Sequence, residues 1–309
     1  MVKVKKMYII IFMNIKKQDK LMILASIFSI STVIMLIVLK VFAYIITGSI
    51  AMLSSLFDSI QDCMTSTINL IAVHHAIMPA DNQHRFGHGK AQGIGSLVQI
   101  CIISISAIFL AKESLLRLLD KQKIIQIDIG IIVSVIAVVL TGLLITFQSW
   151  VIKQTNSLCI KTDKAHYTGD ILMNIGVLIS LIMSSYWGWT WIDGAFGIAV
   201  SIYLVHSMIH IAKETLAMLM DKELPEHVRK KIKSVALSVP SVLNVSDLKT
   251  RQVGTKIFIQ FAVQFDGKIT LDHAHKCIDI IEEKLYTLYP DCEIIVHAEP
   301  FIACKRRKS

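Results

Sequence analysis

Long apolar segments constrain the fold of this chain more than any other feature. Six runs, at roughly 21–47, 49–76, 93–118, 125–151, 160–186 and 191–217, are each long enough to cross about 30 Å of hydrocarbon as a helix. The residues are 54% hydrophobic and only 18% charged, whereas soluble domains carry about 25% charged residues. The sequence therefore predicts an α-helical membrane protein with six transmembrane helices.

The distribution of basic residues predicts the orientation. Lys and Arg are frequent in residues 1–20, in the second and fourth inter-span loops and in the C-terminal tail, but absent from the first and last turns between spans. The third loop is an exception, partly balanced by acidic residues. Because cytoplasmic loops carry an excess of Lys and Arg, we expect both termini in the cytoplasm and the protein in the cell inner (plasma) membrane. The net charge of +9 favours contact with anionic lipid; no motif for nucleic-acid recognition accompanies it, so no nucleic-acid partner is expected.

The composition changes after about residue 220. Residues 225–237 form an amphipathic pattern, 244–252 and 256–265 are typical of strands, 271–288 has helical periodicity, and 293–296 is a short strand pattern. This αββαβ order predicts a small α+β domain with its helices on one face of a sheet. The expected divisions are a cytoplasmic N-terminal segment (1–20), a six-helix transmembrane domain (21–217), a cytoplasmic α+β domain (218–303) and a basic tail (304–309). Residues 8–13 are apolar but too short to span, and either Met1 or Met13 is the first residue.

Ionisable residues inside two spans carry the functional prediction. Asp58 and Asp62 in the second span, and His166 and Asp170 in the fifth, are each spaced by four, which places each pair on one helix face. An Asp at the centre of a span costs about 2.5–3.5 kcal/mol, and a divalent cation would offset that cost. Nitrogen and oxygen ligands suit Zn²⁺ and accept Fe²⁺ or Cd²⁺. Two alternatives are a metal-free proton relay or polar cluster, and a position of His166 in a cytoplasmic loop.

The two pairs are predicted to lie at different depths in the membrane, which conflicts with a shared site. Asp58 lies about nine residues, or about 14 Å, from the outer end of its span, while Asp170 lies about sixteen residues, or about 24 Å, from the outer end of the fifth. The two meet only if the fifth helix tilts or projects beyond the bilayer. Lys40, in the first span, is expected to extend its ammonium group towards the membrane surface.

The loop after the second span holds a second group of candidate ligands. Asp81, His84 and His88 lie within eight residues, and three such ligands can bind a metal with one position left open. The alternative is an ordinary polar loop.

These patterns together resemble the cation diffusion facilitator family, specifically its bacterial ferrous-iron/zinc efflux branch. The likeness runs from about residue 20 to 300 and rests on the two spaced pairs, on Phe86-Gly87-His88-Gly89-Lys90 and on Leu248-Lys249-Thr250-Arg251-Gln252. It implies a homodimer with ferredoxin-like, metallochaperone-like cytoplasmic domains, and metal/proton antiport by alternating access. It implies a secondary transporter rather than an enzyme, with no organic cofactor and with Zn²⁺, Fe²⁺ or Cd²⁺ as cargo.

The resemblance also assigns roles to residues. It implies a transport site formed by Asp58, Asp62, His166 and Asp170, and a second metal site in the loop formed by Asp81, His84 and His88. It also implies a charge pair, Lys90 and Asp221, that locks the two subunits. A cytoplasmic metal site would be formed by His275, His297 and Glu299. At the last site Ser246 and Ala262 occupy two further ligand positions, so weak or mononuclear binding is expected there.

Two other functions compete with transport. A membrane metalloenzyme is disfavoured because the sequence has no His-Glu-x-x-His motif. A membrane-bound metal sensor or scaffold, which binds metal without moving it, remains the alternative. The sequence leaves the physiological metal and the proton stoichiometry open.

Overall fold

The computed structural model describes residues 17–47, 50–119, 128–187 and 191–301. The chain divides into two compact units, Met1–Leu216 and Ala217–Ser309. The apolar segment at residues 8–13, most of the N-terminal segment and the basic tail at 304–309 lie outside the described residues.

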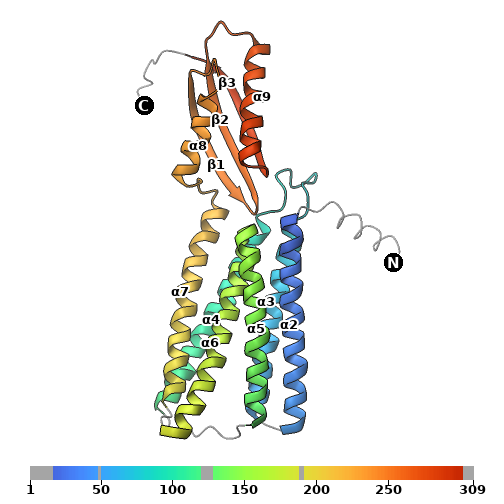
Figure 1. The fold of residues 1–309 in the computed structure, drawn as a ribbon, viewed down its shortest axis with the longest axis vertical. Coiled ribbons are helices and arrows are strands. Elements are labelled where there is room, and N and C mark those ends of the chain that lie inside the picture. Colours follow the sequence, from blue (N-terminus) through green and yellow to red (C-terminus); the bar gives the residue numbers. More distant parts are fainter. Residues whose placement is uncertain (1–16, 48–49, 120–127, 188–190, 302–309) are drawn as a thin grey trace, which may run out of the picture. The chain divides into compact units, whose positions relative to one another are not determined.

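Long helices make up the first unit and run lengthwise along one another (Figure 1). In chain order they are α2 (Lys17–Thr47), α3 (Ile50–Ala76), α4 (Ala91–Leu119), α5 (Asp128–Thr155), α6 (Leu158–Trp187) and α7 (Ile192–Leu219). Helix α2 packs on α3 and α5, and α6 packs on α3, α4 and α5. Each helix covers one of the apolar runs expected to span the membrane.

Four of these helices are apolar enough to cross a membrane by length and composition. In the described part of the chain these spans are Lys17–Ile46, Ala91–Leu118, Ile132–Thr155 and Ile192–Leu219, with mean hydropathies of 2.6, 2.3, 2.2 and 1.7. Six had been expected from the sequence. Helices α3 and α6 do not meet the same criterion, and they are the two helices that carry the ionisable pairs.

Small residues bring some of these helices unusually close. A Cβ atom added to Gly95 on α4 would lie 2.2 Å from the Cβ of Ala72 on α3. A Cβ added to Gly169 on α6 would lie 2.7 Å from a methyl carbon of Leu204 on α7. Real Cβ contacts are not this short, so a larger residue at Gly95 would push α3 and α4 apart, whereas at Gly169 the Leu204 side chain would have to move.

Lys40 does not extend towards the membrane surface as expected. Its Nζ donates to the backbone carbonyl oxygen of Ser55 at 3.0 Å and to the Oγ of Ser59 at 2.7 Å. Both partners belong to α3. The ammonium group is therefore held between two helices, because the acceptors on α3 satisfy it where it lies.

The second unit is a three-stranded sheet with two helices. Its elements are α8 (Glu226–Leu237), β1 (Asn244–Val253), β2 (Lys256–Phe265), α9 (Leu271–Leu288) and β3 (Cys292–Pro300), which is the αββαβ order expected. The sheet order is β1-β2-β3; β1 and β2 are antiparallel, and β2 and β3 are parallel.

One core joins the two helices of this unit to the sheet. Alternate residues of β2, including Phe261 and Val263, pack with Ile232 of α8 and with Ile281 and Leu285 of α9. Helix α9 begins at a capping threonine, Thr270, whose side chain accepts a hydrogen bond from a backbone N–H. The period of two along the strand leaves the intervening residues on the other face of the sheet.

Candidate metal centres

Side chains from α3 and α6 meet inside the helical unit. The Nε2 of His166 lies 3.0 Å from an oxygen of Asp62 and 3.8 Å from an oxygen of Asp170, and one ligand atom from each of the three lies within 4.8 Å of the others. In a tetrahedral centre with bonds of about 2.0–2.2 Å, neighbouring ligand atoms are about 3.4 Å apart. The observed spacings lie on either side of that value, so a divalent ion would fit with small movements.

The surroundings of this centre favour a bound cation. The His166 side chain is 7% exposed and that of Asp62 15%. One carboxylate oxygen of Asp170, Oδ2, is buried without a hydrogen-bond partner. A buried oxygen left unpaired is costly, and a cation held by the three residues would supply the missing partner.

Asp58 does not join this group, in contrast to the four-residue centre predicted from the sequence. Its side chain is exposed, and the cluster of close ligand atoms contains only Asp62, His166 and Asp170 among the described residues. The reason is depth: Asp58 lies four residues, about 6 Å along the axis, nearer the start of α3 than Asp62. Asp62 lies at the same depth as His166, so the predicted difference in depth between the two helices does not keep Asp62 from the centre. It does keep Asp58 away.

The alternative position of His166, in a loop, is wrong. His166 lies within α6, which begins at Leu158, and the residue is 5% exposed. The predicted fifth span, 160–186, is therefore helical from its first residue, through Lys161 and Lys164.

A buried carboxylate that the sequence reasoning missed lies on the same helix. Asp163 is completely buried; one of its oxygens accepts hydrogen bonds from Ser29 of α2 at 2.8 Å and from the amide of Gln148 of α5 at 2.7 Å. Its other oxygen accepts from Ser66 of α3 at 3.4 Å. The hydroxyl of Tyr167 lies 2.7 Å from that of Ser66 and 3.2 Å from that of Ser29. The network thus joins four helices around one carboxylate.

The signal for this residue was present in the sequence. Asp163 precedes His166 by three positions and Asp170 by seven, so all three fall on one helix face.

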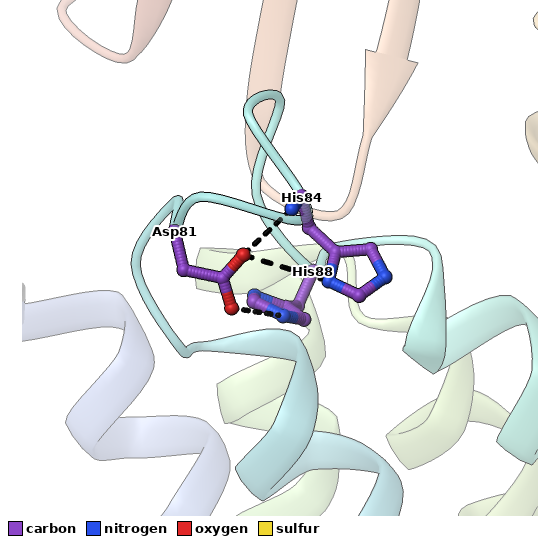
Figure 2. A group of neighbouring side chains, drawn as sticks. All are labelled: Asp81, His84 and His88. Carbon is purple, nitrogen blue, oxygen red and sulfur yellow. Dashed lines mark hydrogen bonds and ion pairs between the residues drawn. The ribbon is translucent and has the colours of Figure 1, made fainter.

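The loop ligands also come together (Figure 2). An oxygen of Asp81 lies 3.6 Å from Nδ1 of His84, and its other oxygen lies 3.4 Å from Nε2 of His88. The two imidazole rings are 4.6 Å apart between centroids. Gly87 adopts a positive φ of 81°, a conformation that glycine accepts without steric cost, and this turn brings His88 back towards Asp81.

Backbone hydrogen bonds fix the Asp81 carboxylate in this loop. The pKa of Asp81 is lowered from its usual range because the carboxylate accepts hydrogen bonds from the backbone N–H groups of His84 and Gln83, with a smaller effect of the nearby imidazoles. These bonds measure 2.6 Å and 2.8 Å. Asp81 is therefore ionised, as a metal ligand must be.

The loop cluster leads to a prediction of metal stoichiometry. Replacing Asp81 by alanine should remove about one equivalent of tightly bound Zn²⁺ per chain, because two imidazoles without the carboxylate hold the ion weakly. Elemental analysis of the dialysed protein measures the change. Asn82→Ala, in the same loop, is the matched control and should retain all of its zinc. Equal zinc content in the Asp81 variant and the unchanged protein would contradict a metal site here.

The candidate ligands of the second unit are not gathered into one site. His297 and Glu299 alternate along β3 with Val296 and Ala298, which pack against the core, so they face away from α9. His275 lies on α9, beside a groove that Ala298 also lines. The three were predicted as one cytoplasmic site, but the sheet separates His275 from the other two.

Two substituted positions of this predicted site are neighbours. The strand register pairs Ser246 with Ala262 and Ala262 with His297, so the three form one row across the sheet. Asp221 is predicted to pair with Lys90. Within its own unit it forms an ion pair with Arg251, whose guanidinium nitrogen lies 3.1 Å from a carboxylate oxygen of Asp221.

Comparison with known proteins matches both units. The family model of the cation efflux transmembrane domain matches residues 26–220, and that of the cation efflux protein cytoplasmic domain matches residues 224–301. The chain is 39% identical to the cation-efflux pump FieF of Shewanella oneidensis over 277 residues, which cover 90% of this chain and 93% of the relative. It is 36% identical to FieF of Pectobacterium atrosepticum, covering 92% and 94% of the two chains. It is also similar to a solved structure of the transporter CzrB in its zinc form, with 30% identity, coverage of 28% of this chain and 99% of that one, and a TM-score of 0.26.

Proposed function

Because the chain belongs to the cation diffusion facilitator family, we propose that it exports Zn²⁺, Fe²⁺ or Cd²⁺ in exchange for protons by alternating access. Members of the family are transporters of divalent metal cations rather than enzymes, and efflux rather than sensing is their activity. The exchange with protons and the identity of the metals are the proposed part.

The observation that carries the proposal is the buried centre on α3 and α6. Asp62, His166 and Asp170 place their ligand atoms within 4.8 Å of one another, and one buried Asp170 oxygen there has no hydrogen-bond partner. We propose that Asp58 completes the set when metal is present, through a change of side-chain rotamer or a small rotation of α3. Three carboxylates and one imidazole accept Zn²⁺, Fe²⁺ and Cd²⁺ without strict selection.

Coupling to protons follows from the chemistry of these ligands. A metal binds ionised carboxylates and a neutral imidazole, so binding releases protons and protonation favours release of the metal. A site that opens outward, where protons are more abundant, would exchange its metal for protons. After returning inward it would lose the protons and bind metal again.

The proposed arrangement in the cell extends the described units. Six spans over residues 21–217 cross the inner membrane, and the N-terminal segment 1–20, the α+β domain 218–303 and the tail 304–309 lie in the cytoplasm. Two chains form a homodimer in lipid, with Lys90 and Asp221 as a charge pair near the membrane. The loop residues Asp81, His84 and His88 hold a second metal. His275, His297 and Glu299 bind metal weakly, since Ser246 and Ala262 supply no ligand and the sheet separates His275 from the other two.

Reconstituted transport tests the proposal. The full chain in vesicles should move Zn²⁺ faster when a proton gradient is imposed across the membrane, and the direction of flux should reverse with the gradient. Fe²⁺ and Cd²⁺ should compete with Zn²⁺ for transport. Flux that is indifferent to the gradient would rule out proton exchange while leaving efflux itself intact.

A second measurement separates transport from a metal-free polar cluster. If the centre is only a proton relay, zinc titration of the purified chain should show the same number of equivalents after Asp62→Asn as before. We expect the variant to lose one equivalent, because Asp62 supplies a ligand atom 3.0 Å from the imidazole nitrogen.

A further inference from the structure

A lysine side chain lies beside the segment of α3 that carries two of the predicted ligands. The Nζ of Lys40 bonds to the carbonyl oxygen of Ser55 and to Ser59 Oγ, and Ser59 is 1% exposed. Ser59 is adjacent to Asp58 and lies three positions before Asp62. Two contacts therefore fix an ammonium group next to the ligand-bearing turns of another helix.

This ammonium group lies near the two carboxylates of α3. It is hydrogen-bonded to Ser59, which follows Asp58 by one position and precedes Asp62 by three on the same helix. Without a metal, carboxylates this close repel one another, and each is costly in an apolar region. A fixed positive charge nearby lowers that cost. No direct ion pair is required, since Coulomb interactions at a few ångströms beyond contact remain sizeable where water is scarce.

We propose that Lys40 is a built-in cation of the transport site, which compensates the carboxylates when the site is empty and opposes the divalent ion when it binds. This inference rests on the proposed function, because it concerns the affinity of the same site. Among the described residues Lys40 contacts Ser55 and Ser59 rather than a predicted ligand, so it sets the affinity through its charge.

The consequence for transport is a limit on how tightly cargo is held. Permeation and transport require binding that is strong enough for entry and weak enough for exit. Where few protons compete, as at alkaline pH, the repulsion from Lys40 acts on both charges of the metal ion. The lysine thereby favours release of the metal from a centre that would otherwise retain it.

Variants at position 40 test this inference through affinity. Lys40→Met and Lys40→Gln should bind Zn²⁺ roughly tenfold tighter or more, measured by calorimetry on the purified full chain in lipid nanodiscs at alkaline pH, where protons compete little. In vesicles both KM and kcat for Zn²⁺ should fall, because tighter binding slows release. Lys40→Arg keeps the charge and should leave Kd unchanged. Lys40→Gln keeps a donor for both partners on α3, so it remains informative if the methionine variant does not fold.

Ser59→Ala is the matched control for a merely structural role. It removes the hydrogen bond from Lys40 to the hydroxyl, which measures 2.7 Å, but retains the charge, and its Kd should equal that of the unchanged protein. Neutral variants with unchanged or weaker zinc binding would overturn the inference. So would an equal gain in affinity from Ser59→Ala, which would attribute the effect to the hydrogen bond.

Titrations of variants that lack Asp170 distinguish a failure of this inference from a failure of the proposed function. Each protein is also titrated with Asp170→Ala added, and the remaining heat, which belongs to other metal sites, is subtracted. If the unchanged protein and its Asp170→Ala version bind zinc identically, the transport site itself is wrong. If they differ while the Lys40 variants bind like the unchanged protein, only the role of Lys40 is wrong.

Discussion

Replacing Asp170 by alanine should abolish Zn²⁺ flux and weaken zinc binding at the central site by more than about 100-fold. Loss of a partner that only orients a ligand costs about 10–100-fold in metal affinity, and Asp170 is proposed to be a ligand itself. Its Oδ2 lies 3.8 Å from the His166 imidazole nitrogen and is otherwise unpaired. Flux into vesicles with an imposed proton gradient measures the effect on transport, and calorimetry measures the effect on binding.

Two controls accompany the Asp170 variant. Asp170→Asn retains the size of the side chain and removes its charge, so it should behave like the alanine variant if charge is what matters. Asp272→Ala removes an aspartate that is exposed on α9 and paired with Lys276 at 2.7 Å, and its flux should be unchanged. Full zinc flux in a folded Asp170→Ala protein would refute the site.

Replacing Asp163 by alanine should lower the free energy of unfolding by about 2–4 kcal/mol. The change removes three hydrogen bonds from a fully buried position. It leaves the Gln148 amide without its acceptor, while Ser29 and Ser66 keep Tyr167 and one another as partners. Unsatisfied buried groups cost about 1–3 kcal/mol each in soluble proteins, while hydrogen bonds between membrane helices average about 0.6 kcal/mol; three bonds place the expected loss between these limits. Thermal unfolding in detergent, compared between variants, measures it.

Ser26→Ala is a suitable control for that loss. Ser26 is also buried, but its hydroxyl donates to the carbonyl of Met22 in the same helix at 3.1 Å, so no interhelical bond disappears and stability should change little. Asp163→Asn keeps acceptor capacity and should lose less stability than the alanine variant. An Asp163→Ala protein as stable as the control would show that the four-helix network contributes no net stability.

The sequence predicts the elements of this fold well because their patterns are long and distinct. The amphipathic pattern at 225–237 and the helical period at 271–288 coincide with α8 and α9 within one residue. The last strand was predicted at 293–296 but extends from Cys292 to Pro300. The sequence of its second half, which holds His297 and Glu299, shows no strand pattern. This half is a strand because it pairs in parallel with β2 as far as Phe265 and Pro300.

The candidate site was predicted less completely than the fold. Spacing alone placed Asp58 and Asp62 on one helix face, but spacing does not say which turn of α3 lies level with His166. The network around Asp163 and the position of Lys40 depend on which helices become neighbours, since their partners are 134 and 19 positions away in the chain. Such contacts have no local sequence signal beyond the cost of the buried charge itself.

The lower hydropathy of α3 and α6 has a consequence for biogenesis. On the six-span arrangement proposed above, each of these helices leaves the ribosome directly after a strongly apolar one, α2 or α5, against which it packs. A polar segment enters lipid more readily beside such a neighbour than alone, because its polar groups find partners there. The order of helices along the chain thus allows the translocon to insert the two ligand-bearing helices as the second arms of helical hairpins.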